Sequence, residues 1–283
     1  MNLRAVSGNQ VQQNLFHYTD ALAIKSILEN RELWLSDIRF LNDSQEMNDG
    51  VKYIVEALGS DLPDVGLGVG GTLYARDYLM EAFDDHISYG IDSEPTFVCS
   101  FSEAGNQLSQ WRAYGGYAIE FDRELIQSAL DLFVCIYNDE EKKHAASYMV
   151  REAIHELASD IEKHGEVSPE GVMCLSMLVR TASIFKDQSF YEEKEVRCAV
   201  DIPLPDSELK FRSRGGLLIP YVTLAFPFAA IKAIHVGPMR DQELAFTSMK
   251  ALVSNVTHDF ISNSNEPISE INVVMSKIPY RAP

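Results

Sequence analysis

The sequence YEEKEVRCAV at residues 191–200 is the stretch around which the rest of the chain is organised. It places Glu192, Glu193 and Glu195 directly before a largely apolar run at residues 196–200. Ionised carboxylates cannot be buried without partners, whereas the valines of this run favour a strand that enters a core. The stretch is therefore predicted to be a loop that delivers acidic side chains to the edge of a sheet.

The two glutamates nearest this strand have the spacing of paired catalytic acids. On an extended chain Glu193 and Glu195 share one face, because side chains alternate with a period of two residues. Two interpretations fit this pattern. The acids are either a solvated, charged start of a strand, or a pair of carboxylates that does chemistry.

The composition is that of a soluble globular protein. The chain has 283 residues, of which 46% are hydrophobic and 23% charged, enough for one large or two modest domains. Its net charge of -18 opposes non-specific attraction to nucleic acid or anionic membranes, since such binding relies on Lys and Arg. No apolar run has the length of a signal-peptide core. None approaches the roughly eighteen apolar residues expected of a membrane span. We expect a cytoplasmic protein.

The cysteines and histidines show no metal-binding pattern. Four cysteines lie far apart in apolar segments without a CxxC pair, so we expect buried free thiols. The seven histidines show no HExxH or comparable ligand spacing. We therefore predict that the protein holds no metal.

The chain is predicted to open with a strand, a helix and a second strand. Residues 15–19 form the first strand, and Thr19 or Asp20 is placed to cap the helix that follows. Residues 32–36 then alternate as a strand does. His17 lies at the end of the first strand, where it is either a hydrogen-bonded core histidine or a polar side chain facing a cleft.

Polar and aromatic candidates also gather in the middle of the chain. Residues 96–102 are predicted to form a strand with Ser100 and Ser102 on one face, where they line a polar pocket or face water. The short helix predicted to follow carries Trp111 and Tyr114 before a glycine break. Aromatic side chains at such a position either pack in the core or stack on a ligand.

The fold class follows from the alternation of strand and helix patterns. Residues 139–187 have a helical pattern that differs from their strand-rich flanks, so we predict a helical insertion there. The sequence contains no internal repeat and no low-complexity linker. We therefore predict a single α+β domain over residues 1–283 with a mixed sheet.

Several blocks of the sequence, taken in order, resemble the bacterial family of domains of unknown function numbered 2971. Each block is short, and it is their order that identifies the family. The blocks are Phe16, His17, Tyr18 and Thr19; Glu32, Leu33, Trp34, Leu35 and Ser36; Phe40, Leu41, Asn42, Asp43 and Glu46; Ser100, Phe101, Ser102 and Glu103; Trp111 and Tyr114; and Tyr191, Glu193, Glu195 and Arg197.

The same order of residues resembles the ADP-ribosyltransferase superfamily. The resemblance consists of a histidine at the end of the first strand, serines on a middle strand and a Glu-x-Glu motif at a later strand. It implies small, largely antiparallel sheets that form a cleft, with NAD bound there as the substrate. His17, with Thr19 beside it, would hold a ribose hydroxyl, and Ser100 or Ser102 would match the middle-strand serine.

The resemblance also implies roles for the acids and the aromatic side chains. Glu195, which stands nearest the strand, would match the glutamate that stabilises the ribosyl cation. Glu193 would match the residue that prepares the acceptor. Tyr18, Trp111 or Tyr114 would stack on the nicotinamide or the adenine. Carboxylates suit this chemistry, because breaking the bond between ribose and nicotinamide develops positive charge at the anomeric carbon.

Two departures from the superfamily pattern leave the acceptor open. Members with paired glutamates usually have Arg on the first strand, where this chain has His17. Members with His there usually have Tyr where this chain has Ser100 and Ser102. The acceptor of ADP-ribose therefore does not follow from the resemblance.

We predict an NAD-using ADP-ribosyltransferase or NAD glycohydrolase, and the family resemblance suggests a bacterial toxin or phage-defence effector. The alternative is a non-catalytic nucleotide-binding or sensing module of the same fold, in which Arg112, Arg197 and aromatic side chains hold the nucleotide. A hydrolase that uses the carboxylates with a metal is the third reading, and no ligand spacing supports it.

Overall fold

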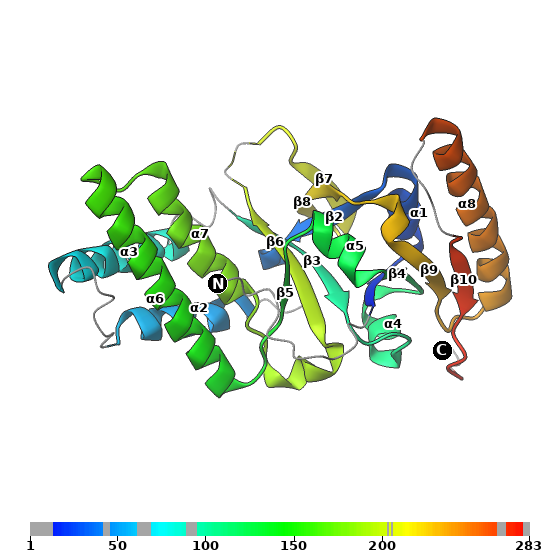
Figure 1. Ribbon diagram of the computed structural model, residues 1–283. Helices are drawn as coiled ribbons and strands as arrows, with labels where there is room; N and C mark the ends of the chain where they lie inside the picture. Colours follow the sequence, from blue (N-terminus) through cyan, green and yellow to red (C-terminus); the bar gives the residue numbers. More distant parts are fainter. Residues whose placement is uncertain are drawn as a thin grey trace.

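The computed structural model describes residues 14–41, 46–60, 69–88, 95–202, 204, 206–264 and 270–279. In these ranges the chain has an α+β fold, in which helices lie at both ends of a central sheet (Figure 1). The α+β class predicted from the sequence is therefore confirmed. The sequence motif at residues 42–45 lies outside the described residues.

The strands form one mixed, largely antiparallel sheet. The strands are β1 Leu15–Thr19, β2 Glu32–Asp37, β3 Thr96–Ser102, β4 Tyr117–Phe121, β5 Leu132–Val134, β6 Glu195–Asp201, β7 Lys210–Arg214, β8 Leu217–Ala225, β9 Ile231–Val236 and β10 Asn272–Met275. Their order is β10-β9-β4-β1-β3-β2-β8-β7, with β6 paired to β3 and β5 to β6. Among these named strands only β9 and β10 pair in parallel.

The prediction of separate small sheets is corrected by strand β3, which joins both halves. Along one edge β3 pairs with β6 from Thr96 to Ser102. On its other edge it pairs with β1 at Ser102 and with β2 at Phe97 and Val98. The two neighbours diverge in between, so the middle of β3 has one edge without a strand partner.

Several of the helices begin at side-chain caps that the sequence offers. They are α1 Ala21–Asn30, α2 Glu46–Leu58, α3 Val69–Ser88, α4 Leu108–Tyr114, α5 Arg123–Ala129, α6 Asp139–His164, α7 Pro169–Ser183 and α8 Gln242–Asn263, with short 3₁₀ segments η1 Ile38–Phe40, η3 Gln188–Glu193 and η4 Phe228–Ala230. Asp20, one of the two predicted caps, accepts a hydrogen bond from the Ala23 amide at 2.8 Å.

Two hydrophobic cores hold the helices against the sheet. One contains residues of β1, β2, β4 and β9 with α1 and α8, and the other contains residues of α2, α3, α6 and α7. Figure 1 shows these two groups of helices at opposite ends of the sheet. The predicted insertion at residues 139–187 supplies α6 and α7, while α2 and α3 come from earlier in the chain.

The four cysteines are free and buried, as predicted. Within the described ranges no helix is long and apolar enough to cross a membrane. Among the same residues no cluster of three or more His, Cys, Asp or Glu is placed to hold a metal ion.

Candidate functional site

A cavity of about 420 Å³ lies where β1 and β2 diverge from β3. Residues 98–102 of β3 line it together with residues of β1, β2, α4, η3, β6 and β7. This volume is in the range of cavities that bind small molecules, and the mixture of aromatic and charged side chains in the wall is typical of such sites.

Eight of the nine site residues predicted from the sequence line this one cavity. They are His17, Tyr18, Thr19, Ser100, Ser102, Tyr114, Glu193 and Glu195. The ninth, Trp111, is 6% exposed and packs edge-on against Tyr18, with 4.7 Å between the ring centroids. Its indole nitrogen donates a hydrogen bond to Asn106 Oδ1 at 3.3 Å. Trp111 therefore supports the cavity wall from behind.

The acidic stretch reaches the cavity through a tight turn. Asp187 caps η3, which ends at Glu193, and Lys194 then takes a left-handed conformation with φ 43° before β6 begins at Glu195. The prediction that Glu193 and Glu195 share a face of an extended strand is therefore wrong. Glu193 precedes the strand, and the turn at Lys194 brings the two carboxylates together instead.

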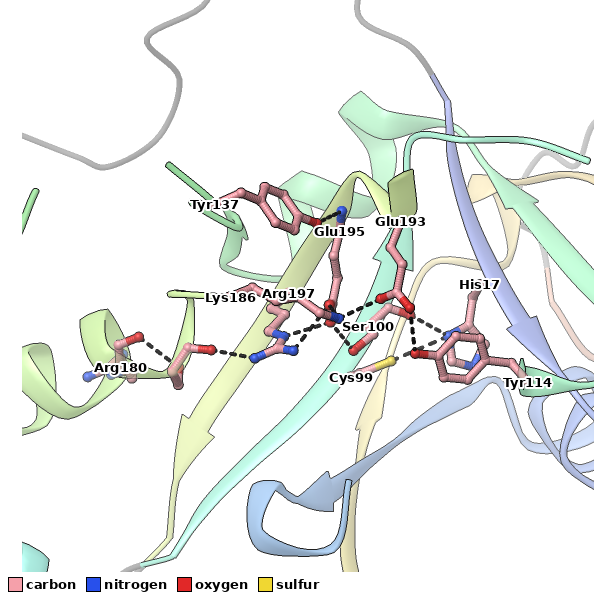
Figure 2. Close-up of polar contacts among 11 residues, drawn as sticks. His17, Cys99, Ser100, Tyr114, Tyr137, Arg180, Lys186, Glu193, Glu195 and Arg197 are labelled. Carbon is pink, nitrogen blue, oxygen red and sulfur yellow. Dashed lines mark hydrogen bonds and ion pairs between the residues drawn. The ribbon is translucent and has the colours of Figure 1, made fainter. Parts of the chain in front are cut away.

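Lys186 bridges the two glutamates (Figure 2). Its Nζ donates to Glu193 Oε2 and to Glu195 Oε2, both at 2.5 Å, and the side chain is only 4% exposed. It also lies 5.1 Å from the centroid of the Phe190 ring. The sequence interpretation missed Lys186. The available signal was a lone lysine between a helical segment and the acidic stretch.

The Glu195 carboxylate uses its full capacity to accept hydrogen bonds. Oε1 accepts from Ser100 Oγ at 2.5 Å and from Arg197 Nε at 2.6 Å. Oε2 accepts from Lys186 Nζ at 2.5 Å and from Arg197 Nη2 at 3.1 Å. A carboxylate offers about four lone-pair positions, so no position is left for another donor.

The charge of Glu195 is held by these two cations. Burial disfavours the ionised form, but Arg197 and Lys186 outweigh it and lower the pKa of Glu195 to about 2. Arg197 is 1% exposed, and its Nη1 donates to the Ser183 carbonyl at 2.5 Å. The Glu195 amide donates to the Tyr137 hydroxyl at 2.8 Å. Glu195 is therefore an ionised, fully partnered group in the wall of the cavity.

This buried charge predicts a loss of stability in acid. The pKa of Glu195 is lowered on folding from 4.5 to about 2. Its contribution is therefore fully present above pH 4.5 and lost as the pH falls towards 2, amounting to about 3 kcal/mol. Urea unfolding of wild type and Glu195→Gln between pH 2 and pH 6 measures it. The difference in unfolding free energy between the two proteins should shrink with falling pH, and a constant difference would contradict the assignment.

Glu193 has a more open environment than Glu195. Its side chain is 17% exposed and accepts from Lys186, while the Tyr114 hydroxyl lies 3.5 Å from Oε1. Because two contacts do not fill four lone-pair positions, Glu193 can still accept a hydrogen bond or a proton from a ligand. It is the carboxylate of the pair that the cavity leaves accessible.

His17 faces the open edge of β3. Its Nδ1 lies 2.9 Å from the Ser100 carbonyl, which only accepts, so Nδ1 carries the hydrogen. Burial lowers the pKa of His17, and the positive charge of Arg212 lowers it further against the opposing effect of the carbonyl. The ring is thus neutral at pH 7, and Nε2 presents a lone pair that can accept from a ligand hydroxyl.

The two serines of β3 fix the acidic stretch. Ser100 Oγ donates to Glu195, as described, and Ser102 Oγ donates to the Glu193 backbone carbonyl at 2.5 Å. Both serines line the cavity, and both hydroxyl groups hold the chain segment that carries the acids.

A cationic wall completes the cavity on the side of β2 and β7. Arg212 and Arg214 of β7 and Trp34 and Ser36 of β2 line it there. None of these four was predicted as a site residue. The signal that could have found the arginines is their spacing of two residues, which places them on one face of a strand.

Part of the chain matches a known family. The model of a family described as "Protein of unknown function (DUF2971)" matches residues 110–198, less than half of the chain. The matched segment contains Trp111, Tyr114, Glu193 and Glu195, whereas His17 and the serines of β3 lie outside it. No curated protein and no solved structure matched the chain. The family match supports the resemblance seen in the sequence over this segment, and its description assigns no chemistry.

Proposed function

We propose that the cavity binds NAD and that the protein is an ADP-ribosyltransferase-like enzyme. The reaction would break the bond between ribose and nicotinamide and transfer ADP-ribose to an acceptor or to water. The observation that carries the proposal is the convergence of His17, Ser100, Glu193 and Glu195, from three distant parts of the chain, on one cavity.

The two glutamates take different parts in this proposal. Nicotinamide leaves with the bonding electron pair, and positive charge develops on the ribose carbon. In this proposal the Glu193 carboxylate stabilises that positive charge. It also accepts the proton that the acceptor hydroxyl or water releases as the new bond forms. Glu195 is saturated by its four donors, so its part is to hold Lys186 and, through Lys186, to orient Glu193. This reverses the order of importance expected from the sequence.

The other predicted residues have supporting parts. The neutral His17 ring offers Nε2 to a ribose hydroxyl, which suits the role that the resemblance implies. Tyr114 lies on the cavity wall beside Glu193, where its ring can stack on the nicotinamide.

A second candidate is a nucleotide-binding module without catalysis. The observation that favours it is the saturation of Glu195, the residue that the superfamily resemblance would make the catalytic acid. A carboxylate that Lys186 and Arg197 already neutralise has little charge left to offer a developing cation. This candidate predicts thermal stabilisation by NAD without turnover.

Nicotinamide release and thermal stability in the presence of NAD separate the two candidates. We would compare wild type with Ala113→Trp, because Ala113 is an exposed residue at the rim of the cavity and an indole there should block access without disturbing the core. Release by wild type that Ala113→Trp reduces supports the enzyme. A thermal shift without release, with cell extract supplied as acceptor, supports the binding module. Neither release nor a shift in wild type overturns both.

A further inference from the structure

We propose that Arg212, with Arg214 beside it, forms a phosphate-binding subsite in the wall of the cavity formed by β2 and β7. The full ligand, a nucleotide with its ribose near Glu193, rests on the proposed function. The subsite itself rests only on the contacts and charges around Arg212.

The Arg212 guanidinium is held in place by two neighbours on β2. Its Nη2 donates to Ser36 Oγ at 2.7 Å, and its central carbon lies 5.6 Å from the centroid of the Trp34 ring. Its Nε is buried and has no hydrogen-bond partner among the described residues. A buried donor without a partner is costly, so its presence at a cavity indicates a group that a ligand completes.

Arg212 differs from the buried cations Lys186 and Arg197 of the cavity in its charge balance. Lys186 and Arg197 are each paired with Glu195, and Lys186 also with Glu193. Arg212 forms no ion pair with any residue in the described part of the chain, and the charges that act on it most strongly are those of Arg214 and, in the opposite sense, Asp20. Burial and the charge of Arg214 both lower the pKa of Arg212, and an anion bound between the two arginines would relieve both effects.

The charged side chains that line the whole cavity also favour the binding of an anion. The cavity is lined by four cationic side chains and three carboxylates, although the chain as a whole has a net charge of -18. Cations at a concave site of an otherwise acidic protein attract and orient an anionic ligand. The planar fork of a guanidinium suits the oxygens of a phosphate, which it can bind through two hydrogen bonds.

The subsite and the acids approach the cavity from opposite edges of β3. The Arg212 side chain lies against β2, which pairs with one edge of β3. Glu193 and Glu195 enter the cavity at the start of β6, which pairs with the other edge of β3. A ligand that touches both therefore carries its phosphate at a distance from the group that meets Glu193. A nucleoside diphosphate linked to a second ribose has this form.

Equilibrium binding of adenosine, ADP and inorganic pyrophosphate tests the subsite. Of the two tryptophans, Trp34 lines the cavity, so its fluorescence reports binding there and calorimetry gives the affinity. We expect wild type to bind ADP at least about tenfold more tightly than adenosine, with an affinity that falls as salt rises. Binding of ADP and not of pyrophosphate would mean that the nucleoside is needed, and binding of both would mean that the phosphates suffice. Both outcomes support the subsite.

Variants of the arginines complete the test. Arg212→Gln should weaken ADP binding at least about tenfold and leave adenosine binding within twofold, since a charge-assisted hydrogen bond is lost. Arg212→Lys should fall between wild type and Arg212→Gln. Arg214→Gln, at an exposed position where folding is not at risk, should weaken ADP binding by a smaller factor. Arg151→Gln, on the exposed face of α6, is the matched control and should change nothing.

Two results would overturn the subsite. One is equal affinity of wild type for ADP and adenosine, and the other is unchanged ADP affinity in folded Arg212→Gln and Arg214→Gln. The outcome is independent of NAD cleavage. A preference for ADP that Arg212→Gln abolishes, in a protein that releases no nicotinamide, would retain the subsite and refute the proposed enzyme.

Discussion

Glu193→Gln is expected to lower the rate of nicotinamide release from NAD by at least about a hundredfold, the effect of losing one preorganised electrostatic group at a reacting centre. The substitution removes the member of the Glu193 and Glu195 pair that is open to the cavity, while a neutral amide keeps nearly the same shape. Single-turnover release at saturating NAD is the measurement, because it separates the chemical step from product release.

The neighbouring acid provides the control for this variant. Glu192 is exposed, and Glu192→Gln removes the same charge from the same turn without touching the cavity. Its rate should equal that of wild type. The proposed role of Glu193 would be wrong if Glu193→Gln kept its activity, or if Glu192→Gln lost as much. A Lys186→Met variant, in which Glu193 loses its cation, should lose activity in part.

Arg197→Leu is expected to lower the free energy of unfolding by about 3–5 kcal/mol, the usual cost of removing one partner of a buried ion pair. Arg197 is 1% exposed, and its loss leaves the Glu195 carboxylate with Lys186 as its one close cation among the residues that the structure describes. It also leaves the Ser183 carbonyl without its donor. Urea unfolding at pH 7 measures the loss, and Arg151→Leu on the exposed face of α6 should stay within about 0.5 kcal/mol of wild type.

A second substitution shows whether this loss comes from the unpaired charge. Glu195→Leu combined with Arg197→Leu removes both members of the pair, and apolar replacements of a buried pair are often neutral. The double variant should therefore recover much of the stability lost in Arg197→Leu, since Lys186 keeps Glu193 as its partner. A loss of less than about 1 kcal/mol in the unfolding free energy of Arg197→Leu would contradict this account. So would a double variant whose loss equals the sum of the losses in the Glu195→Leu and Arg197→Leu single variants.

Local signals in the sequence were sufficient for the elements that carry the site. The strand that contains Ser100 and Ser102, the helix that ends at Tyr114 and the cap at Asp20 follow from alternation, apolar spacing and capping chemistry. These features depend on residues a few positions apart, which is the range over which backbone geometry and hydrogen bonding act.

The detailed arrangement of the acids required the folded chain. A period-two argument placed Glu193 and Glu195 on one face, whereas the left-handed residue Lys194 brings them together through a turn. A positive φ at lysine has a weak sequence signal, because most residues avoid that region and tertiary contacts decide where it is tolerated. The same tertiary contacts decided that the ionised Glu195 carboxylate is fully paired with donors and that the Glu193 carboxylate remains accessible from the cavity.

The sequence by itself determined the α+β class, the buried thiols and the presence of acids at the start of a strand, because each depends on local pattern and composition. Only the tertiary structure decided that Lys186 lies between the two acids and that Arg212, far from Ser36 in the sequence, contacts it in one wall of the cavity. The physical reason is that these contacts join segments distant in the sequence. Their distances depend on how β1, β2 and β6 pair with β3, and no local pattern records that pairing.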